Sequence, residues 1–257
     1  MANKVVELVK EVRMRMPRIG TRKLHYLLQP KLKELGVGRD RLFAILKANH
    51  MQIAPKRQYH ITTNSHHRFR KHKYLLEGFD FNRPNQVWVT DITYIGTRKN
   101  PMYLALVTDA YSKMIVGFNV SNSLCTSGSL KALEMALKRK RDITKTLIHH
   151  SDRGVQYCSN EYQELLTKSN LKCSMTESYD PYQNAIAERV NGILKQEFLF
   201  GITVSNMHLM NFLIQESVDI YNNERPHLSC GMRTPNQMNK QSKIKIKNYK
   251  SKKYHLV

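Results

Sequence analysis

The chain has 257 residues and a formal net charge of +22, because 42 Lys and Arg residues outweigh 20 Asp and Glu residues. Hydrophobic residues make up 41% of the chain, which is enough to build a buried core and excludes a wholly disordered protein. The positive charge favours a polyanionic partner such as nucleic acid. A membrane-spanning segment is not expected, since no stretch approaches the about 18 consecutive apolar residues that it needs.

The N-terminus and the cysteines indicate an intracellular protein. The first residues, MANKVVELVKEVRMRMP, lack the apolar core and the small-residue cleavage site of a signal peptide. The four cysteines are scattered and never form a C-x-x-C pair, so we expect reduced thiols and no structural zinc site. They are Cys125, Cys158, Cys173 and Cys230.

Residues 1–54 are expected to form a small all-α domain. Apolar positions in residues 2–16 have helical spacing, and Pro17 ends this first helix. TRKLHYLLQ and RDRLFAILKANH predict two further helices, separated by a break at residues 36–38. Three helices with a glycine-containing turn, and with Arg39 and Arg41 at the start of the last one, are typical of a helix-turn-helix DNA-binding domain. A plain three-helix bundle with a solvated basic face fits the same spacing equally well.

Two basic segments are expected to lie outside the packed domains. Residues 55–80 begin with PKRQYHITTNSHHRFRKHK, which has no apolar periodicity and is interpreted as a linker that tracks phosphates. The histidines of this segment have no Cys or carboxylate partner nearby, so no metal site is expected there. Residues 241–257 are interpreted as a basic C-terminal tail.

Residues 81–240 predict an α/β domain. QVWVTDITYI, MYLALVTDAYS and KMIVGFNVS are rich in β-branched and aromatic residues and predict three adjacent strands. TLIHHSD and LKCSMT predict two more strands. Helices are predicted for SGSLKALEMALKRK, SNEYQELLTKSN, NAIAERVNGILKQEFLF and SNMHLMNFLIQESVDIYNNE. This order is typical of a mixed five-stranded sheet with flanking helices.

Two aspartates lie in or beside apolar strands. Asp91 shares one face of the first strand with Val87 and Val89, where an unpaired carboxylate is costly to bury. We therefore expect either a salt bridge with Lys or Arg or a bound cation. Asp152 ends the fourth strand, at the edge where open α/β sheets bind ligands. The alternative, that Asp152 caps the next helix, is weak because Ser159 or the residue after it supplies that cap.

A third carboxylate lies on the helix that follows the fifth strand. Asn184, Glu188, Asn191 and Lys195 share the polar face of this helix. Alone, Glu188 is typical of a solvated glutamate. Two aspartates at neighbouring strand ends and a glutamate on a covering helix can, however, converge on a pair of Mg²⁺ or Mn²⁺ ions, which prefer oxygen ligands. Two such ions about 4 Å apart support in-line attack at phosphorus, here in a nucleic-acid backbone.

Five segments, in order, resemble a known family. WVTDITYI, LVTDAYSKMIVGFNVS, HSDRGVQYCSNEYQELL, SMTESYDPYQNAIAERVNGILKQEF and YNNERPHLSCGMRTPNQM resemble the integrase core of bacterial insertion-sequence transposases. The most similar group encodes the catalytic half in a second reading frame, which frameshifting fuses to an upstream half. The resemblance covers roughly residues 18–240, and the 35 residues between Asp152 and Glu188 match the spacing in the family's DDE triad.

The resemblance implies an RNase H-like fold in which Asp91, Asp152 and Glu188 are the catalytic residues and hold two Mg²⁺ or Mn²⁺ ions. It implies a DNA transposase that cleaves insertion-sequence ends and transfers the freed 3′-OH to another phosphodiester. Lys195, seven residues after the glutamate, is expected to contact the element end. The other expected DNA contacts are Asn184, Asn191, Arg39 and Arg41.

The expected partners are DNA, namely the terminal inverted repeats and the target, and further copies of the chain as a homo-oligomer on DNA. The upstream-frame product or the fused transposase is a further expected partner, since the chain begins where a second-frame product begins. The expected location is the bacterial cytoplasm, in association with the nucleoid. Two other functions stay open: a non-catalytic DNA-binding regulator of the fused transposase, and an RNase H-like nuclease for RNA–DNA hybrids.

Overall fold

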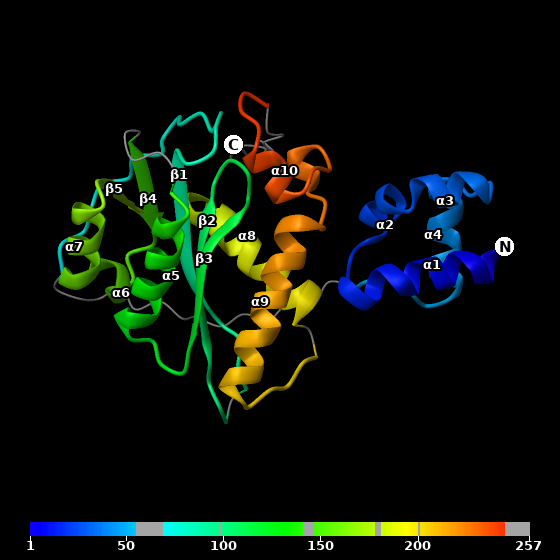
Figure 1. Cartoon of the computed structure of the whole chain (residues 1–257), viewed down its shortest axis with the longest axis horizontal. Helices are drawn as coiled ribbons and strands as arrows, with labels where there is room; N and C mark the ends of the chain where they lie inside the picture. Colours follow the sequence, from blue (N-terminus) through cyan, green and yellow to red (C-terminus); the bar gives the residue numbers. More distant parts are fainter. Residues whose placement is uncertain (55–68, 98, 141–145, 178–180, 200, 245–257) are drawn as a thin grey trace, which may run out of the picture.

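The computed structural model describes residues 1–54, 69–97, 99–140, 146–177, 181–199 and 201–244. Figure 1 shows a helical unit at the N-terminus beside a larger α/β unit. Most of the expected linker and of the expected C-terminal tail lies outside the described residues. No helix among the described residues combines the length and the apolar character that a membrane crossing requires.

The helical unit has four helices, α1 (Ala2–Arg15), α2 (Thr21–Leu27), α3 (Gln29–Glu34) and α4 (Arg39–Ala48). The sequence predicted three, because its second helix, TRKLHYLLQ, ends at residue 29 and α3 was not predicted. The chain leaves helical geometry at Leu28 and restarts with Pro30 in the first turn of α3, where the missing N–H of proline has no cost. Leu24, Leu32 and Leu42 are fully buried and build the core between these helices.

The α/β unit is built on a five-stranded sheet in the order β3-β2-β1-β4-β5. Its strands are β1 (Val87–Tyr94), β2 (Tyr103–Asp109), β3 (Ile115–Ser121), β4 (Leu147–Ser151) and β5 (Leu171–Met175). The first three pair antiparallel, and β1, β4 and β5 pair parallel. The five predicted strands and the mixed α/β class are thereby confirmed.

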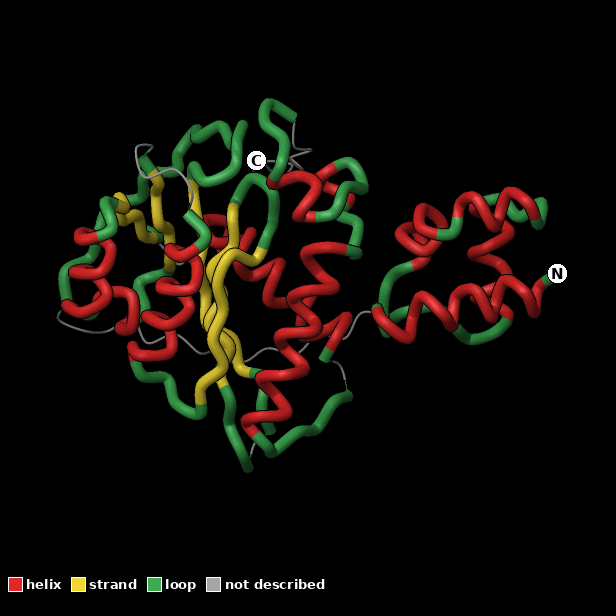
Figure 2. Tube along the Cα trace, in the orientation of Figure 1, coloured by secondary structure: helices red, strands yellow, loops and turns green. Residues whose placement is uncertain are grey.

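Helices cover both faces of the sheet (Figures 1 and 2). One face carries α5 (Thr126–Lys138), α6 (Val155–Cys158) and α7 (Asn160–Lys168), which pack on Ala105 and Val107 of β2. The other face carries α8 (Ala185–Ile193) and α9 (Met207–Asn223), which pack on Leu104 and Leu106 of the same strand. Successive residues of β2 thus face the helices on opposite sides of the sheet, because side chains alternate along a strand. The short elements η3 (Leu228–Cys230) and α10 (Pro235–Asn239) follow α9.

Two features of the α/β unit differ from the sequence prediction. The helix predicted over residues 184–200 begins with the 3₁₀ turn η1 (Pro181–Asn184) and ends in the π-helical turn η2 (Leu194–Phe198). The end of the expected linker also packs on the sheet. The backbone N–H of Leu75 donates to Ser174 Oγ at 3.0 Å, and the carbonyl oxygen of Lys73 accepts from Met175 N at 3.3 Å. The outer edge of β5 is therefore covered by this segment.

Candidate active site

The register of the sheet places Asp91 and Asp152 next to each other. The parallel pairing of β1 with β4 sets Val89 opposite His150, and each aspartate lies two residues beyond its member of this pair. Neighbouring strands lie about 4.8 Å apart. Asp91 therefore lies in the middle of β1, and Asp152 directly follows the end of the neighbouring β4, although the two residues are 61 positions apart. The predicted place of Asp152 at a strand end is confirmed, but that of Asp91 is wrong, because β1 continues to Tyr94.

The helix that carries Glu188 is hydrogen-bonded to β1 on both sides of this residue. Asn184 donates from Nδ2 to the carbonyl oxygen of Thr90 at 3.1 Å, and Asn191 donates from Nδ2 to Asp91 Oδ2 at 2.8 Å. Residues 184, 188 and 191 share one face of a helix, so these two bonds place Glu188 on the side of α8 nearer to β1, where its side chain remains exposed. Ala187 packs in the same cluster as Val89 and reinforces the contact.

The charges of the three carboxyl groups act on one another. The pKa of Asp91 is raised to about 7, chiefly by burial and then by the negative charges of Asp152 and Glu188. The hydrogen bonds from Asn191 and the Ile92 amide lower this pKa but do not outweigh the increase. Burial and the charge of Asp152 also raise the pKa of Glu188. Such mutual repulsion is the environment that a divalent cation relieves.

The oxygen ligands at this site suit a hydrated Mg²⁺ or Mn²⁺ ion better than an ion that is enclosed entirely by protein ligands. Among the described residues, no three His, Cys, Asp or Glu side chains are gathered closely enough to hold one ion. Mg²⁺ is commonly held by one or two carboxylates and completes its shell with water and substrate oxygens. The buried Oδ1 atoms of Asn184 and Asn191 have no hydrogen-bond partner in the described structure.

A tight turn follows Asp152. The N–H of Gly154 donates to Asp152 Oδ1 at 3.0 Å, and a Cβ added at Gly154 would come within 3.0 Å of the same oxygen. A larger residue at this position would crowd the carboxylate. Ser159 caps α7 by accepting from Tyr162 N, so the prediction that Asp152 is not needed as this cap is confirmed.

Two histidines before Asp152 belong to the interior. His149 and His150 are fully buried, and burial lowers the pKa of His150 to about 4. The neutral His150 ring donates from Nε2 to the carbonyl oxygen of Gln183 and accepts at Nδ1 from Ser174 Oγ, both at 2.9 Å. It ties β4 to η1, the turn that leads into the Glu188 helix. The role of His150 is therefore structural.

The expected DNA contacts have very different surroundings. Asn184 and Asn191 are buried, and both amide groups bind β1, so the polar face of α8 lies against the sheet. Lys195 lies in η2. Burial lowers the pKa of its ammonium group, and the negative charge of Asp91 partly offsets this decrease. Arg39 and Arg41 are exposed at the start of α4. As DNA contacts, all five stay predictions.

Comparison with known proteins identifies the α/β unit. Residues 82–181 match the model of the integrase core domain, and residues 169–235 match a second model with the same description. A chain in the structure of the simian T-cell lymphotropic virus intasome, in complex with PP2A regulatory subunit B56 gamma, aligns with a TM-score of 0.54 and 21% identity. That alignment covers 90% of this chain and 78% of the other. The expected RNase H-like integrase fold is confirmed.

Relatives in bacteria are more similar in sequence. The chain is 39% identical over 220 residues to the insertion element IS600 uncharacterized 31 kDa protein of Shigella sonnei, which covers 84% of this chain and 79% of that protein. It is 37% identical to the transposase for insertion sequence element IS629 of Shigella sonnei, over 57% of this chain and 49% of that protein. It is 36% identical to the transposase InsF for insertion sequence IS3A of Escherichia coli K12, over 63% and 57%. These last two alignments span only about half of each transposase.

The match to the IS600 protein spans most of this chain, and the two integrase-core matches cover the α/β unit. The chain belongs to the insertion-sequence transposases that carry an integrase core domain, a family that acts in DNA transposition.

Proposed function

We propose that this chain cleaves DNA at the ends of its insertion sequence and transfers the freed strand end, with Asp91, Asp152 and Glu188 as the catalytic residues. The observation that carries the proposal is the sheet register, in which β1 and β4 are neighbours and each aspartate lies two residues beyond the pair Val89–His150. The upward pKa shifts of Asp91 and Glu188 support it, because both arise in part from the charge of Asp152.

The three carboxylates would hold two Mg²⁺ or Mn²⁺ ions, which when bound activate an attacking oxygen and stabilise a leaving oxygen at phosphorus. Asn191 holds the Asp91 carboxylate at a fixed position on the strand. Lys195, on the continuation of the same helix, is placed to bind a phosphate near the reacting group. The protein's contribution is to position the DNA and to stabilise charge.

The reaction has two in-line displacements. In the first, water attacks a phosphodiester at the element end, the P–O3′ bond breaks, and a free 3′-OH remains on one strand. In the second, this 3′-OH attacks another phosphodiester, so that one P–O bond forms as another breaks. No Ser or Tyr nucleophile is needed, since neither step passes through a covalent bond between enzyme and DNA.

The helical unit and the positive charge supply DNA binding in this proposal. Arg39 and Arg41, exposed at the start of α4, would contact the terminal inverted repeats, and the excess of 22 positive charges would hold both element and target DNA. The functional form would be a homo-oligomer that bridges two element ends, with the upstream-frame product or the fused transposase as a further partner. The reaction would take place on DNA in the bacterial cytoplasm.

The test is strand transfer on labelled element-end DNA with Mg²⁺ or Mn²⁺. Asp152→Asn should abolish both cleavage and strand transfer. Asp80→Asn, the same change at an exposed carboxylate outside the site, should leave both intact. Equal yields from the wild type and Asp152→Asn would refute the assignment. Efficient cleavage of an RNA–DNA hybrid without element ends would favour a nuclease instead.

A further inference from the structure

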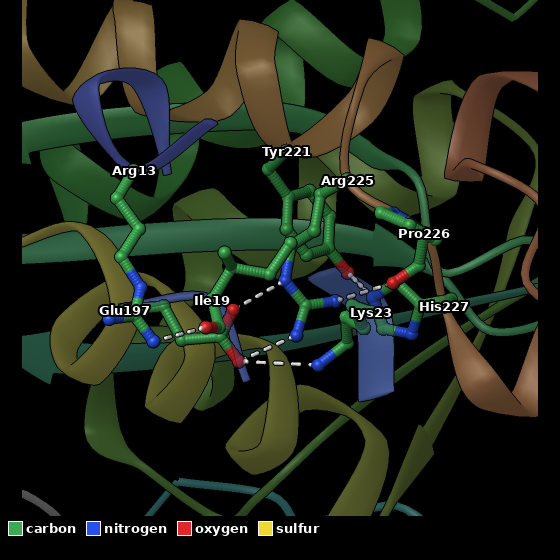
Figure 3. A network of polar contacts seen from close by, with 8 residues as sticks. All are labelled: Arg13, Ile19, Lys23, Glu197, Tyr221, Arg225, Pro226 and His227. Atoms are coloured by element: carbon green, nitrogen blue, oxygen red, sulfur yellow. Dashed lines mark hydrogen bonds and ion pairs between the residues drawn. The ribbon is translucent and has the colours of Figure 1, made fainter. Parts of the chain in front are cut away.

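A buried ion pair lies at the end of the catalytic helix, on the side of the helical unit (Figure 3). Glu197 in η2 accepts from Nε and Nη2 of Arg225 at 2.7 and 2.6 Å. The Arg225 side chain is 1% exposed and that of Glu197 is 16% exposed. Burial raises the pKa of Glu197, but the hydrogen bonds and charge of Arg225 outweigh it, and the pKa is lowered overall. Glu197 is therefore ionised and held firmly by the core.

The N-terminal helical unit contacts the same glutamate. The Nζ atom of Lys23, in α2, lies 3.7 Å from Oε1 of Glu197, and the Lys23 side chain is 17% exposed. The backbone N–H of Arg18, in the loop between α1 and α2, donates to the carbonyl oxygen of Glu197 at 3.2 Å. A second ion pair, between Arg15 and Glu224, lies nearby at the end of α9. One residue of the core thus binds both the side chain and the backbone of the helical unit.

Glu197 belongs to the helical stretch that carries the catalytic groups. Residues 185–198 form one continuous stretch, α8 followed by η2, so Glu197 lies nine residues after Glu188 and two after Lys195. Its last turn is π-helical, with Leu199 N bonded to the carbonyl oxygen of Leu194 at 3.0 Å. Such wide turns are rare and are frequently found at functional sites. The other end of the stretch is held to β1 by the two asparagines, so Glu197 is the second anchor.

We propose that Glu197 is a positioning residue that couples the helical unit to the active site. By docking on Glu197 through Lys23 and the Arg18 amide, the helical unit holds the end of the helix that carries Glu188 and Lys195. The helical unit is then a support of the catalytic geometry as well as a DNA-binding element. This inference rests on the proposed function, because it assigns a role to the same helix.

The test removes the cross-unit ion pair and leaves the buried Glu197–Arg225 pair in place. Lys23→Met is compared with Lys31→Met, a matched change at a 58% exposed lysine of the same helical unit. Lys23→Arg keeps the charge and should recover function. For each variant, element-end DNA affinity is measured without divalent metal, strand transfer is measured at saturating DNA, and Mn²⁺ binding is measured by calorimetry.

Lys23→Met should bind DNA within about twofold of Lys31→Met but transfer strands at least about tenfold more slowly, because small displacements of catalytic groups are costly. Its Mn²⁺ affinity should also fall, and Lys23→Arg should restore both. The inference is overturned if Lys23→Met matches Lys31→Met in turnover and Mn²⁺ binding, or if its only loss is DNA affinity or folded fraction. A wild-type chain that neither binds Mn²⁺ nor transfers strands would overturn the proposed function itself.

Discussion

Replacing Asp91 with Asn should stabilise the metal-free protein while abolishing its activity. The pKa of Asp91 rises from 3.8 to about 7 in the folded chain, chiefly because of burial and the charge of Asp152. One pKa unit corresponds to about 1.4 kcal/mol, so the ionised carboxylate costs the folded state up to about 4 kcal/mol above pH 7. Asp91 is only partly buried, and the single amide oxygen of Asn can accept only one of the two bonds that the carboxylate accepts from Asn191 and the Ile92 amide, so we expect a net gain of about 1–3 kcal/mol.

The pH dependence follows from the sign of this shift. Between about pH 4 and pH 7 the folded state binds the proton of Asp91 more tightly than the unfolded state does, so stability falls as the pH rises through this window. Below pH 4 the group is protonated in both states and has no cost. Asp91→Asn should therefore raise the unfolding temperature by several degrees at pH 8 and by much less at pH 4.

The assay is thermal unfolding followed by circular dichroism in EDTA at both pH values, with Asp80→Asn as the control. Mn²⁺ should then stabilise the wild type but not Asp91→Asn, because only the folded wild type offers the carboxylate pair. An Asp91→Asn protein no more stable than the wild type at pH 8 would refute the proposed repulsion. An equal gain at pH 4 would show that the effect is not electrostatic.

Three further changes test the packing, the site and the DNA interface. Gly117→Ala should destabilise the fold by about 1–3 kcal/mol in chemical denaturation, since its Cβ would lie 2.1 Å from the carbonyl oxygen of Ala132 in α5. Gly192→Ala, with nothing within 4 Å of its Cβ, should be neutral or stabilising in the same experiment. Asn191→Ala should raise the Mn²⁺ concentration for half-maximal strand transfer without changing DNA affinity, because it frees the Asp91 carboxylate. DNA binding should weaken steeply with salt, and Lys195→Ala should reduce the slope of log affinity against log salt by about one; an unchanged slope would exclude a phosphate contact.

Much of the α/β unit could be predicted because its signals are local. Runs such as VWVTDITY and YLALVTD are rich in β-branched and aromatic residues, as expected of strands buried on both faces, and this composition is visible without any partner strand. Asp152 and Glu188 were found through their spacing within a resemblance that spans most of the chain. The helical unit was predicted less completely, because α3 has one fully buried leucine, Leu32, and so shows almost no periodicity.

The roles of individual polar residues could not be predicted in the same way. Asn184 and Asn191 share the polar face of α8, and that face was expected to contact DNA. In the structure the amides of Asn184 and Asn191 bind β1, where they satisfy a backbone carbonyl and the partly buried carboxylate of Asp91. Periodicity identifies a polar face of a helix but not the surface that this face contacts. The sequence pattern is the same whether the polar side chains bind buried polar groups or are exposed to solvent.

By itself, the amino-acid sequence determined the strands, the apolar layers and the basic charge, and it singled out three candidate carboxylates, since each depends on local periodicity, composition or spacing. Only the tertiary structure decided that Asp91 lies beside Asp152 and that Asn191 holds it. It also decided that Lys23, Glu197 and Arg225 meet, although Lys23 and Glu197 are 174 residues apart. The physical reason is that pairing register and side-chain packing join segments that are remote along the chain, and these contacts set the burial and charge on which the site depends.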